Sequence, residues 1–297
     1  MEFRDLTTFV RVAEEGDFSA AARSLGLTPS GVSKTIARLE DGLGRRLLQR
    51  SSRTMRLTPE GEHFLDAARR VLDAMQEAEA IGSAIPTGTL RIRCVPTFAR
   101  YQLAPIIPEF RRLYPRLRIA FVLSNERTAS LDDQADVAIA SGDLPNSSLI
   151  ARRIASSRWV ICASPAYLAE RGSLASPADL GRHECLNFSM QTRWNSWSAV
   201  VGAPTDEGGI VANQGDMLLA LARAGAGIVR LAEFHISDDL HAGRLVRLFP
   251  DEQDQTEEPI YVLYQERRNL SPRIRAFVDF VERAFADTPW RYEPRST

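Results

Sequence analysis

The stretch AAARSLGLTPSGVSKTIARLEDGL, residues 20–43, decides how the rest of the chain is interpreted. It predicts a short helix, a tight turn at Gly26 and a second helix that begins with its own cap. Thr28 supplies a hydroxyl at the N-cap, and Pro29 takes the first helical position, where its missing N–H costs nothing. The order helix, turn, helix is the framework around which the neighbouring residues are assigned.

The second helix separates into two faces when its residues are placed at about 100° intervals. Its apolar face consists of Val32, Ile36, Leu39 and Leu43. The opposite face carries small polar and basic side chains, namely Ser30, Ser33, Lys34, Ala37, Arg38 and Asp41. Small residues allow close approach and basic ones reach phosphates and base edges, so this face suits a DNA major groove. The alternative is an ordinary helical hairpin in which Lys34 and Arg38 are only solvated.

A cluster of arginines after this helix favours DNA binding over a solvated hairpin. It consists of Arg45, Arg46, Arg50, Arg53 and Arg56, interleaved with Leu47, Leu48, Met55 and Leu57. The pattern predicts a short two-stranded wing whose arginines follow the DNA backbone or enter the minor groove. Because the formal net charge is −1, affinity for DNA must come from this local clustering.

The remaining composition narrows the class of protein. The length of 297 residues predicts two or three compact units. Cys94, Cys162 and Cys185 have no metal-ligand spacing and lie in apolar runs, which predicts buried thiols in a reducing compartment and no metal or cofactor. The N-terminal MEFRDL has no apolar signal core, and no run reaches membrane-spanning length. We therefore expect a cytoplasmic protein.

Residues 1–61 resemble the winged helix-turn-helix of LysR-type transcriptional regulators. The matching residues are Leu6, Phe9, Phe18, Ser19, Ala21, Ala22, Leu25, Leu27, Ser30, Val32, Ser33, Ile36, Leu39, Glu40, Leu43, Gly44, Leu47, Arg50, Leu57, Thr58 and Gly61. The resemblance and the helix faces together predict a DNA-contacting set of Thr28, Pro29, Ser30, Ser33, Lys34, Arg38, Arg50 and Arg53. The family often has Gln, Ala and Arg where this chain has Pro29, Gly31 and Lys34, so its operator preference cannot be taken from relatives.

A long helix is predicted from about Pro59 to Ile85. Its apolar residues recur at steps of four and three, the spacing of a coiled-coil seam: Phe64, Ala68, Val71, Met75, Ala78 and Gly82. A stripe this narrow suits a second copy of the chain, whereas the alternative is packing on the next domain. In the family this linker helix is the dimerisation element, and the resemblance implies a homotetramer built as a dimer of dimers.

From Thr89 onward, strands alternate with helices. Predicted strands are 89–95, 118–123, 137–140, 159–163, 186–188, 210–212, 228–231, 245–249 and 260–264. Helices are expected at about 99–114 and at 217–224, and a short helix at 130–135. Strand–helix–strand order implies a parallel, doubly wound sheet in each of two halves. A final helix with Ile274, Phe277, Val278, Val281 and Phe285 on one face returns to the first half.

This region resembles the periplasmic-binding-protein fold of LysR-type effector domains. The matching pieces are ASPAYL from Ala163, PADL from Pro177, DVAI from Asp136, GAGI from Gly225 and LSPRIRAFVDF from Leu270. The expected fold class is therefore multidomain α and α/β. It comprises a winged helix-turn-helix at 1–58, a linker helix at 59–88 and an effector domain at 89–297. Within the effector domain we expect one subdomain at about 89–161 and 265–297, and another at about 162–264.

In such sheets a ligand binds beyond the carboxyl ends of the strands, where the two halves meet. The predicted effector-binding residues are Thr97, Phe98, Arg100, Asn125, Ser141, Phe188, Trp194, Gln214 and Asp216. Thr97 is the best single candidate, because family effectors commonly contact that position. The alternative is that Thr97 and Asp216 only cap their helices. Relatives often have an Arg within the segment Ala140–Gly142 and a Leu-Pro at Leu231–Ala232. The first departure removes a potential anion partner, so a carboxylate effector does not follow; the alternative is that Arg100, Arg158 or Arg230 replaces that charge.

Three functions compete at this stage. A sequence-specific transcriptional regulator would bind an operator, respond to a small molecule and, as the resemblance implies, contact RNA polymerase. A related alternative is a regulator with no small-molecule effector. An enzyme would need a convergent nucleophile, base or metal set, but His63, His183, His235 and His241 are scattered. A solute-binding protein would have no use for a DNA-binding head. We therefore expect a regulator and not an enzyme.

Overall fold

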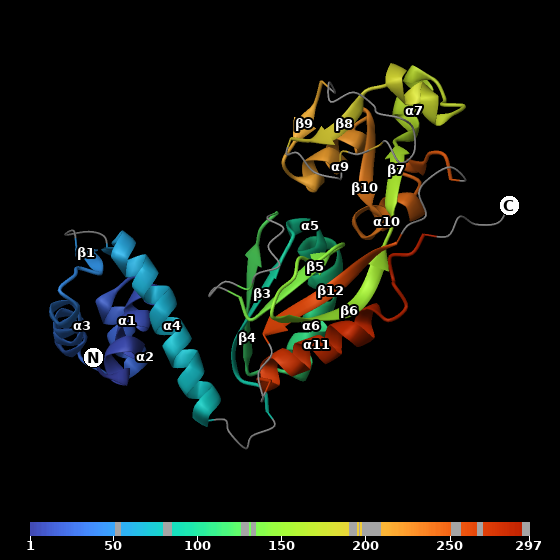
Figure 1. Cartoon of the computed structure of the whole chain (residues 1–297). Helices are drawn as coiled ribbons and strands as arrows, with labels where there is room; N and C mark the ends of the chain where they lie inside the picture. The colour runs from blue at the N-terminus through green and yellow to red at the C-terminus, as the bar shows by residue number, and fades with distance from the viewer. Residues whose placement is uncertain are drawn as a thin grey trace. The chain divides into compact units, whose positions relative to one another are not determined.

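The computed structural model describes residues 1–50, 55–79, 85–125, 131, 135–189, 195, 197, 209–250, 257–265 and 270–292, without the side chains of residue 50 and residues 76–79. The chain divides into two compact units (Figure 1). The first comprises Met1–Thr89 with Arg116–Arg118, and the second comprises Leu90–Pro115 with Ile119–Thr297.

The first unit is a helix-turn-helix followed by a wing and a long helix. Its elements are α1 (Phe3–Glu15), α2 (Phe18–Leu25), α3 (Pro29–Leu43), β1 (Leu48–Arg50), β2 (Met55–Leu57) and α4 (Pro59–Glu79). Gly26 has φ 65° at the turn after α2, a conformation that glycine adopts without steric cost. Asp17 caps α2, and its Oδ1 accepts the N–H of Ala20 at 2.7 Å.

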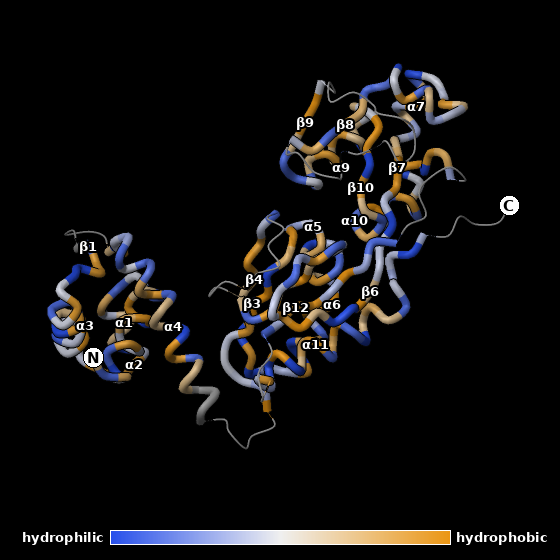
Figure 2. Tube along the Cα trace, in the orientation of Figure 1, coloured by the Kyte–Doolittle hydropathy of each residue, from blue (hydrophilic) through white to orange (hydrophobic). Residues whose placement is uncertain are grey.

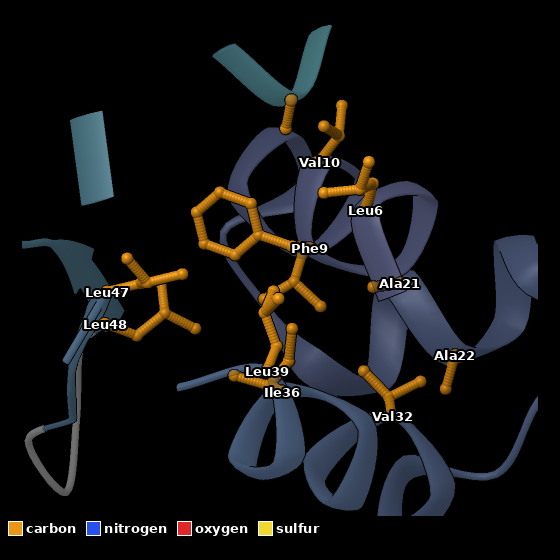
Figure 3. Packing of buried hydrophobic residues seen from close by; sticks show 12 residues of the cluster. Leu6, Phe9, Val10, Ala21, Ala22, Val32, Ile36, Leu39, Leu47 and Leu48 are labelled. Atoms are coloured by element: carbon orange, nitrogen blue, oxygen red, sulfur yellow. The ribbon is translucent and has the colours of Figure 1, made fainter. Parts of the chain in front are cut away.

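One hydrophobic core holds α1, α2, α3 and the first wing strand together (Figure 3). It contains Leu6, Phe9, Val10, Val12, Ala21, Ala22, Val32, Ile36, Leu39, Leu47, Leu48 and Ala68. The predicted apolar face of the second helix is confirmed for Val32, Ile36 and Leu39, each at most 2% exposed. Leu43 at the end of the same face is 37% exposed and does not belong to this core.

The stripe of α4 does not behave as one continuous seam. Ala68 is 1% exposed in the core of its own unit, and the ring of Phe64 meets that of Phe9 with centroids 5.2 Å apart. Val71 and Met75, one turn and two turns after Ala68, are 45% and 38% exposed. The expectation that the whole stripe needs a second copy was therefore wrong for its first half, because α1 lies close enough to cover it. Residues 80–84 of the predicted helix lie outside the described residues.

The second unit contains two five-stranded sheets, each with its own helices; residues 88–89 and 117–118, at the starts of two of their strands, fall in the first unit by the division above. The first half-domain contains β3 (Gly88–Cys94), α5 (Pro96–Phe98), the π-helical turn η1 (Ala99–Leu103), α6 (Ala104–Leu113), β4 (Leu117–Leu123), β5 (Val137–Ser141), β6 (Leu149–Ser157), β12 (Glu258–Gln265) and α11 (Pro272–Phe285). The second half-domain contains β7 (Trp159–Ala163), α7 (Pro165–Arg171), the 3₁₀ helix η2 (Pro177–Arg182), β8 (Cys185–Phe188), β9 (Val211–Ala212), α9 (Gly215–Arg223), β10 (Ile228–Ala232), α10 (Glu233–His241) and β11 (Val246–Arg247).

The sheets are mixed, which corrects the expectation of fully parallel sheets. The strand orders are β4-β3-β5-β12-β6 and β11-β7-β10-β8-β9. The pairs β3–β5, β8–β10 and β8–β9 are parallel, whereas β12 runs antiparallel to both β5 and β6, and β7 runs antiparallel to both β10 and β11. The late strand β12 thus returns to the first sheet beside β6.

Three further sequence expectations differ from the structure. The nine-residue strand β6 went unpredicted because charged Arg152 and Arg153 interrupt its apolar pattern. Helix α10 also went unpredicted, because its buried face includes Glu233, His235 and Asp239, which hide the helical period. The expected strand at 245–249 is reduced to β11, and most of the predicted helix at 130–135 lies outside the described residues.

The predicted burial of the three thiols is confirmed, since Cys94, Cys162 and Cys185 are buried and unbridged. Burial raises the pKa of Cys94 to about 12 and that of Cys185 to about 11. Helix α11 shows why the final segment packs well: hydrophobic and hydrophilic residues alternate along it (Figure 2), and Phe277 and Val281 are fully buried. No helix within the described ranges is long and apolar enough to cross a membrane.

Candidate DNA interface and effector site

The start of α3 is built as its sequence predicts. Thr28 has extended backbone, and its Oγ1 accepts the N–H of Gly31 at 3.1 Å and lies 3.2 Å from Ser30 Oγ. Pro29 occupies the first helical position, and Thr28, Pro29 and Ser30 are all exposed. These three predicted DNA contacts therefore stand together at the N-terminal end of the helix, where hydroxyls and backbone N–H groups can meet a phosphate.

The two basic residues of α3 have different surroundings. Lys34 is exposed, and Ser33 beside it is half-buried. Arg38, one turn after Lys34, donates a hydrogen bond from Nη2 to Oδ1 of Asp5 on α1. Sequence reasoning did not find Asp5, because its 33-residue separation from Arg38 carries no local signal.

The wing is anchored by a carboxylate on α3, that of Glu40. Glu40 is 2% exposed, and its Oε1 accepts the N–H groups of Leu47 at 2.8 Å and Leu48 at 3.1 Å. Its Oε2 accepts Nη1 of Arg46 at 2.9 Å. Burial opposes the charged form, but these hydrogen bonds outweigh it and hold the pKa of Glu40 below its usual value. The acid thus fixes the chain where it leaves α3.

The other end of the wing is closed by Thr58. Its Oγ1 donates to the carbonyl of Arg46 at 2.7 Å and accepts the N–H of Gly61 at 2.9 Å, and its own N–H donates to the carbonyl of Leu47 at 3.0 Å. The strands pair antiparallel, with Leu48 opposite Leu57. Two of the predicted DNA contacts belong to the wing. The backbone of Arg50 lies on β1, but its side chain is not among the described atoms, and Arg53 lies outside the described residues.

Four of the nine predicted effector residues, Thr97, Arg100, Asn125 and Asp216, lie where the two half-domains meet. Thr97 lies in α5 and is close to Gly215 at the start of α9. If Gly215 carried a Cβ, that atom would lie only 3.3 Å from Cγ2 of Thr97. The same added Cβ would be 3.1 Å from Cε1 of His235. Within the described part of the chain the Thr97 hydroxyl has no hydrogen-bond partner, and the N-cap of α5 is Val95, so the capping alternative does not account for Thr97.

Asp216 contacts side chains of both half-domains. Its Oδ1 accepts Nε2 of His235 at 3.2 Å, and its Oδ2 lies 3.4 Å from Nη1 of Arg100 in the other half-domain. The hydrogen bond from His235 holds the pKa of Asp216 below its usual value. Burial lowers the pKa of His235, whose ring packs at a tilt of 53° against that of Tyr101, with the centroids 4.9 Å apart. The capping alternative does not hold for Asp216 either, because its carboxylate is directed to these side chains.

Two further hydrogen bonds join the half-domains. Asn125 donates from Nδ2 to the carbonyl of Asn213 at 2.7 Å, and Gln102 donates from Nε2 to the carbonyl of Phe234 at 2.6 Å. Each links segments more than 80 residues apart, since the separations are 88 and 132 residues. The junction therefore depends on side chains that no local pattern brings together.

The other predicted effector residues are less suited to direct contact. Phe98 is 2% exposed and its ring packs edge-on against Phe234, Phe285 and Trp290, so it supports the junction from within the core. Phe188 exchanges two backbone hydrogen bonds with the amide of Asn195.

Ser141 ends β5 and Gln214 precedes α9, and both are half-buried. Trp194 lies outside the described residues. Among those described, no three or more His, Cys, Asp or Glu side chains could together hold a metal ion.

Comparison with known families and proteins agrees with both units. Residues 3–62 match the model described as "Bacterial regulatory helix-turn-helix protein, lysR family", and residues 83–286 match the "LysR substrate binding domain". The chain is 34% identical over 284 residues to the HTH-type transcriptional regulator CrgA of Neisseria meningitidis serogroup C (strain 8013), covering 93% of this chain and 95% of that protein.

Two further matches extend over almost the whole chain. An HTH-type transcriptional repressor of Pseudomonas aeruginosa (strain UCBPP-PA14) is 35% identical over 293 residues, which is 96% of this chain and 92% of that protein. The solved structure of CrgA from Neisseria meningitidis, a LysR-type transcriptional regulator, superposes with a TM-score of 0.63 at 32% identity. That match covers 95% of this chain and 98% of the solved chain.

Proposed function

Because the chain belongs to the LysR-type transcriptional regulators, we propose that α3 and the wing bind a double-stranded DNA operator and that a small-molecule effector at the half-domain junction controls this binding. The observation that carries the DNA-binding part is the two-sided helix α3. Val32, Ile36 and Leu39 fix one side in the core, and Ser30, Lys34 and Arg38 stay exposed on the other. A helix held in this way can enter a major groove.

The proposed DNA contacts are the predicted set from Thr28 to Arg53. Thr28, Pro29 and Ser30 would meet a phosphate or base edge at the start of α3, and Lys34 would act as a point charge on the backbone. Arg50 and Arg53 would extend the contact along the wing. Since an operator is part of the bacterial chromosome, the proposed site of action is the cytoplasm, and no catalytic activity is assigned to the chain.

Self-association through α4 is part of the proposal. Val71 and Met75 are exposed one turn apart on this helix, and a second copy would cover both. Two copies would present two recognition helices to two half-sites. We propose the domain division 1–58, 59–88 and 89–297. The half-domain bounds expected at 161/162 and 264/265 are moved, because β7 (Trp159–Ala163) pairs in the second sheet and β12 (Glu258–Gln265) pairs in the first. A tetramer and a contact with RNA polymerase are the further partners that the family membership suggests.

The proposed effector lies against Thr97, Arg100, Asn125 and Asp216. These residues offer a hydroxyl, a guanidinium, an amide and a carboxylate at the point where α5 and the start of α9 approach one another. A ligand that contacts both half-domains would shift the equilibrium between their open and closed arrangements. This shift would in turn change the affinity for DNA. The second candidate, a regulator that needs no small molecule, would leave these residues as junction contacts only.

The DNA-binding proposal is tested by selecting bound duplexes from a random library with the full-length protein. Affinities for the selected duplex are then measured by anisotropy at several salt concentrations. Replacing Lys34 by Met should weaken binding about tenfold at moderate salt and reduce the slope of log affinity against log salt by about 1. The charge-matched control is Arg112→Met on α6 of the second unit, which should leave both values unchanged. Selection of no duplex by the natural chain would refute the proposal.

The effector part is tested by thermal-shift screening of the full-length protein against small metabolites, followed by DNA titrations with any stabilising compound. Thr97→Val removes the hydroxyl at nearly constant volume. It should abolish the ligand-dependent change in DNA affinity and leave binding without ligand unchanged. If the screen yields a ligand and the variant responds normally, Thr97 is not part of the site. If no compound stabilises the chain, the regulator without an effector is favoured.

A further inference from the structure

The ion pair between Asp5 and Arg38 joins the buried and exposed sides of the DNA-binding unit. The Asp5 side chain is 3% exposed, whereas that of Arg38 is 60% exposed. Oδ1 of Asp5 accepts Nη2 of Arg38, and Oδ2 accepts the backbone N–H of Glu2 at 2.8 Å. The carboxylate is therefore held in place by the first turn of α1 before it reaches α3.

The charge of this pair is fixed at neutral pH. Burial disfavours the charged carboxylate, but the hydrogen bond from Arg38 and the backbone hydrogen bond from Glu2 outweigh it, and the pKa of Asp5 lies below its usual value. The carboxylate and the guanidinium thus cancel in net charge. Arg38 keeps its remaining N–H donors, on Nε, Nη1 and the second N–H of Nη2, on the exposed face of α3.

Lys34 provides the contrast within the same helix. It lies one turn before Arg38 and is exposed, with no hydrogen bond or ion pair among the described residues. A mobile ammonium that displaces counterions contributes to affinity for any DNA sequence. A neutralised guanidinium with a fixed orientation contributes little to counterion release, but it can donate to a base edge in one geometry.

We propose that Asp5 is a positioning residue for DNA recognition, which holds Arg38 so that Arg38 discriminates between base sequences instead of adding a charge for the phosphate backbone. The proposal rests on the DNA-binding function proposed above. Its chemical target is the major-groove edge of a guanine, which offers the O6 and N7 acceptors that an arginine fork fits. Asp5 restricts the Arg38 side chain when the unit folds. The entropic cost of ordering Arg38 is therefore not incurred again when DNA binds.

The test compares the affinity for the selected duplex with that for a scrambled duplex of the same composition, using the full-length protein. Arg38→Met and Arg38→Lys should each reduce this ratio about ten- to a hundredfold. The salt slope should change by much less than the loss of about 1 expected for Lys34→Met. The lysine variant keeps the charge and loses only the fork, so it separates geometry from electrostatics.

Asp5→Asn should change the affinities for the two duplexes unequally. It frees the charge of Arg38, so affinity for the scrambled duplex should rise, while the loss of orientation lowers the ratio roughly tenfold. The control is Asp41→Asn, which makes the same charge change at an exposed position of α3. It should raise binding to both duplexes equally and preserve the ratio. Asp5→Glu should retain part of the discrimination.

Three outcomes overturn the proposal. One is an unchanged ratio in both Arg38 variants. Another is a loss of about 1 in salt slope at constant ratio, which would make Arg38 an ordinary phosphate contact. The third is an Asp5→Asn variant that is folded by circular dichroism and loses affinity for both duplexes equally, as a purely structural role predicts. If Asp5→Asn does not fold, the two Arg38 variants decide the question. Selection of no duplex by the natural chain would instead refute the DNA-binding function.

Discussion

The DNA-binding surface and the half-domain junction are assembled in opposite ways. The exposed face of α3 comes from one continuous helix, and the acid that anchors its wing, Glu40, lies on that same helix. The junction depends on pairs such as Asn125 with Asn213 and Gln102 with Phe234, which are 88 and 132 residues apart. A surface that one helix presents can be recognised from its period, whereas a junction becomes visible only when the chain has folded.

Both regions nevertheless use a carboxylate to connect elements. In the first unit Glu40 satisfies two backbone N–H groups and an arginine. At the junction Asp216 meets His235 and Arg100, and it is 30% exposed where Glu40 is 2% exposed. Glu40 is shielded from solvent and binds mainly backbone N–H groups, whereas Asp216 is partly exposed to solvent and binds side chains. We therefore expect mutations of the first to cost stability and those of the second to change conformational balance.

The largest effect is expected for Glu40→Ala. It leaves the N–H groups of Leu47 and Leu48 buried without their acceptor, which should lower the free energy of unfolding of the first unit by about 3 kcal/mol. Hydrogen exchange of peptides from residues 44–58 should accelerate accordingly, and DNA binding should be lost with the wing. The matched control for stability is Asp41→Ala, the same truncation at an exposed acid in the next position.

The same variant tests the separation between the regions. All four tryptophans, Trp159, Trp194, Trp197 and Trp290, belong to the second unit. Their fluorescence change on urea unfolding should therefore be the same for Glu40→Ala and for the natural chain. A shifted fluorescence transition would contradict the idea that Glu40 acts only within its own unit.

A slightly smaller effect is expected for Gly61→Ala. A Cβ at this position would lie 2.0 Å from the carbonyl oxygen of Leu47, so either α4 or the wing must move. Overpacking against backbone should cost about 2–3 kcal/mol of stability in the first unit. The control is Gly42→Ala, where an added Cβ meets nothing within 4 Å and helix propensity should increase stability by up to about 1 kcal/mol. Faster hydrogen exchange in Gly61→Ala together with slower exchange in Gly42→Ala would support this account. A change in the same direction in both variants would contradict it.

The sequence predicted those parts of the molecule whose signals are local. The helix bounds near Thr28 and Leu43 follow from a cap, a proline and a 3.6-residue period, and the structure places them as expected. The family and the combination of a DNA-binding unit with a two-half α/β domain also followed from residue matches. By contrast, Asp5 as the partner of Arg38 carries no local signal, because a buried acid in an amphipathic helix resembles any solvated acid.

The misses in the second unit have the same physical origin. Strand β12 pairs with β5 and β6 only after a long excursion through the other half-domain, so its antiparallel direction could not follow from a strand–helix–strand pattern. His235 was one of four scattered histidines in the sequence, yet it is buried beside Gly215 and Asp216. Phe98 follows Thr97 directly, but the helical turn directs it into the aromatic core. Adjacent residues thus serve different layers of the junction.

The smallest of these effects is expected for protonation of His235, and it should appear only in the second unit. Burial lowers the pKa of this residue below the value of 6.5 that it has in the unfolded chain. Below pH 6.5 the unfolded state therefore binds the proton first, and the free energy of unfolding should fall as the pH falls. The slope is at most about 1.4 kcal/mol per pH unit for one histidine.

The groups that face His235 determine how strongly the free energy of unfolding depends on pH. Asp216 and Asp239 favour the protonated ring and Arg223 opposes it, while the ring of Tyr101 covers one side; desolvation outweighs the two acids. His235→Gln removes the titration and should flatten the dependence of the tryptophan-detected urea transition between pH 6.5 and 5.5. His183→Gln is the comparison: its pKa is also lowered by burial, but it is only half-buried, so its contribution should be smaller. An unchanged slope in His235→Gln would mean that the junction relaxes around the charged ring. The long-range contacts of the junction would then rearrange more easily than the solvent-shielded hydrogen bonds between Glu40 and the backbone of the wing.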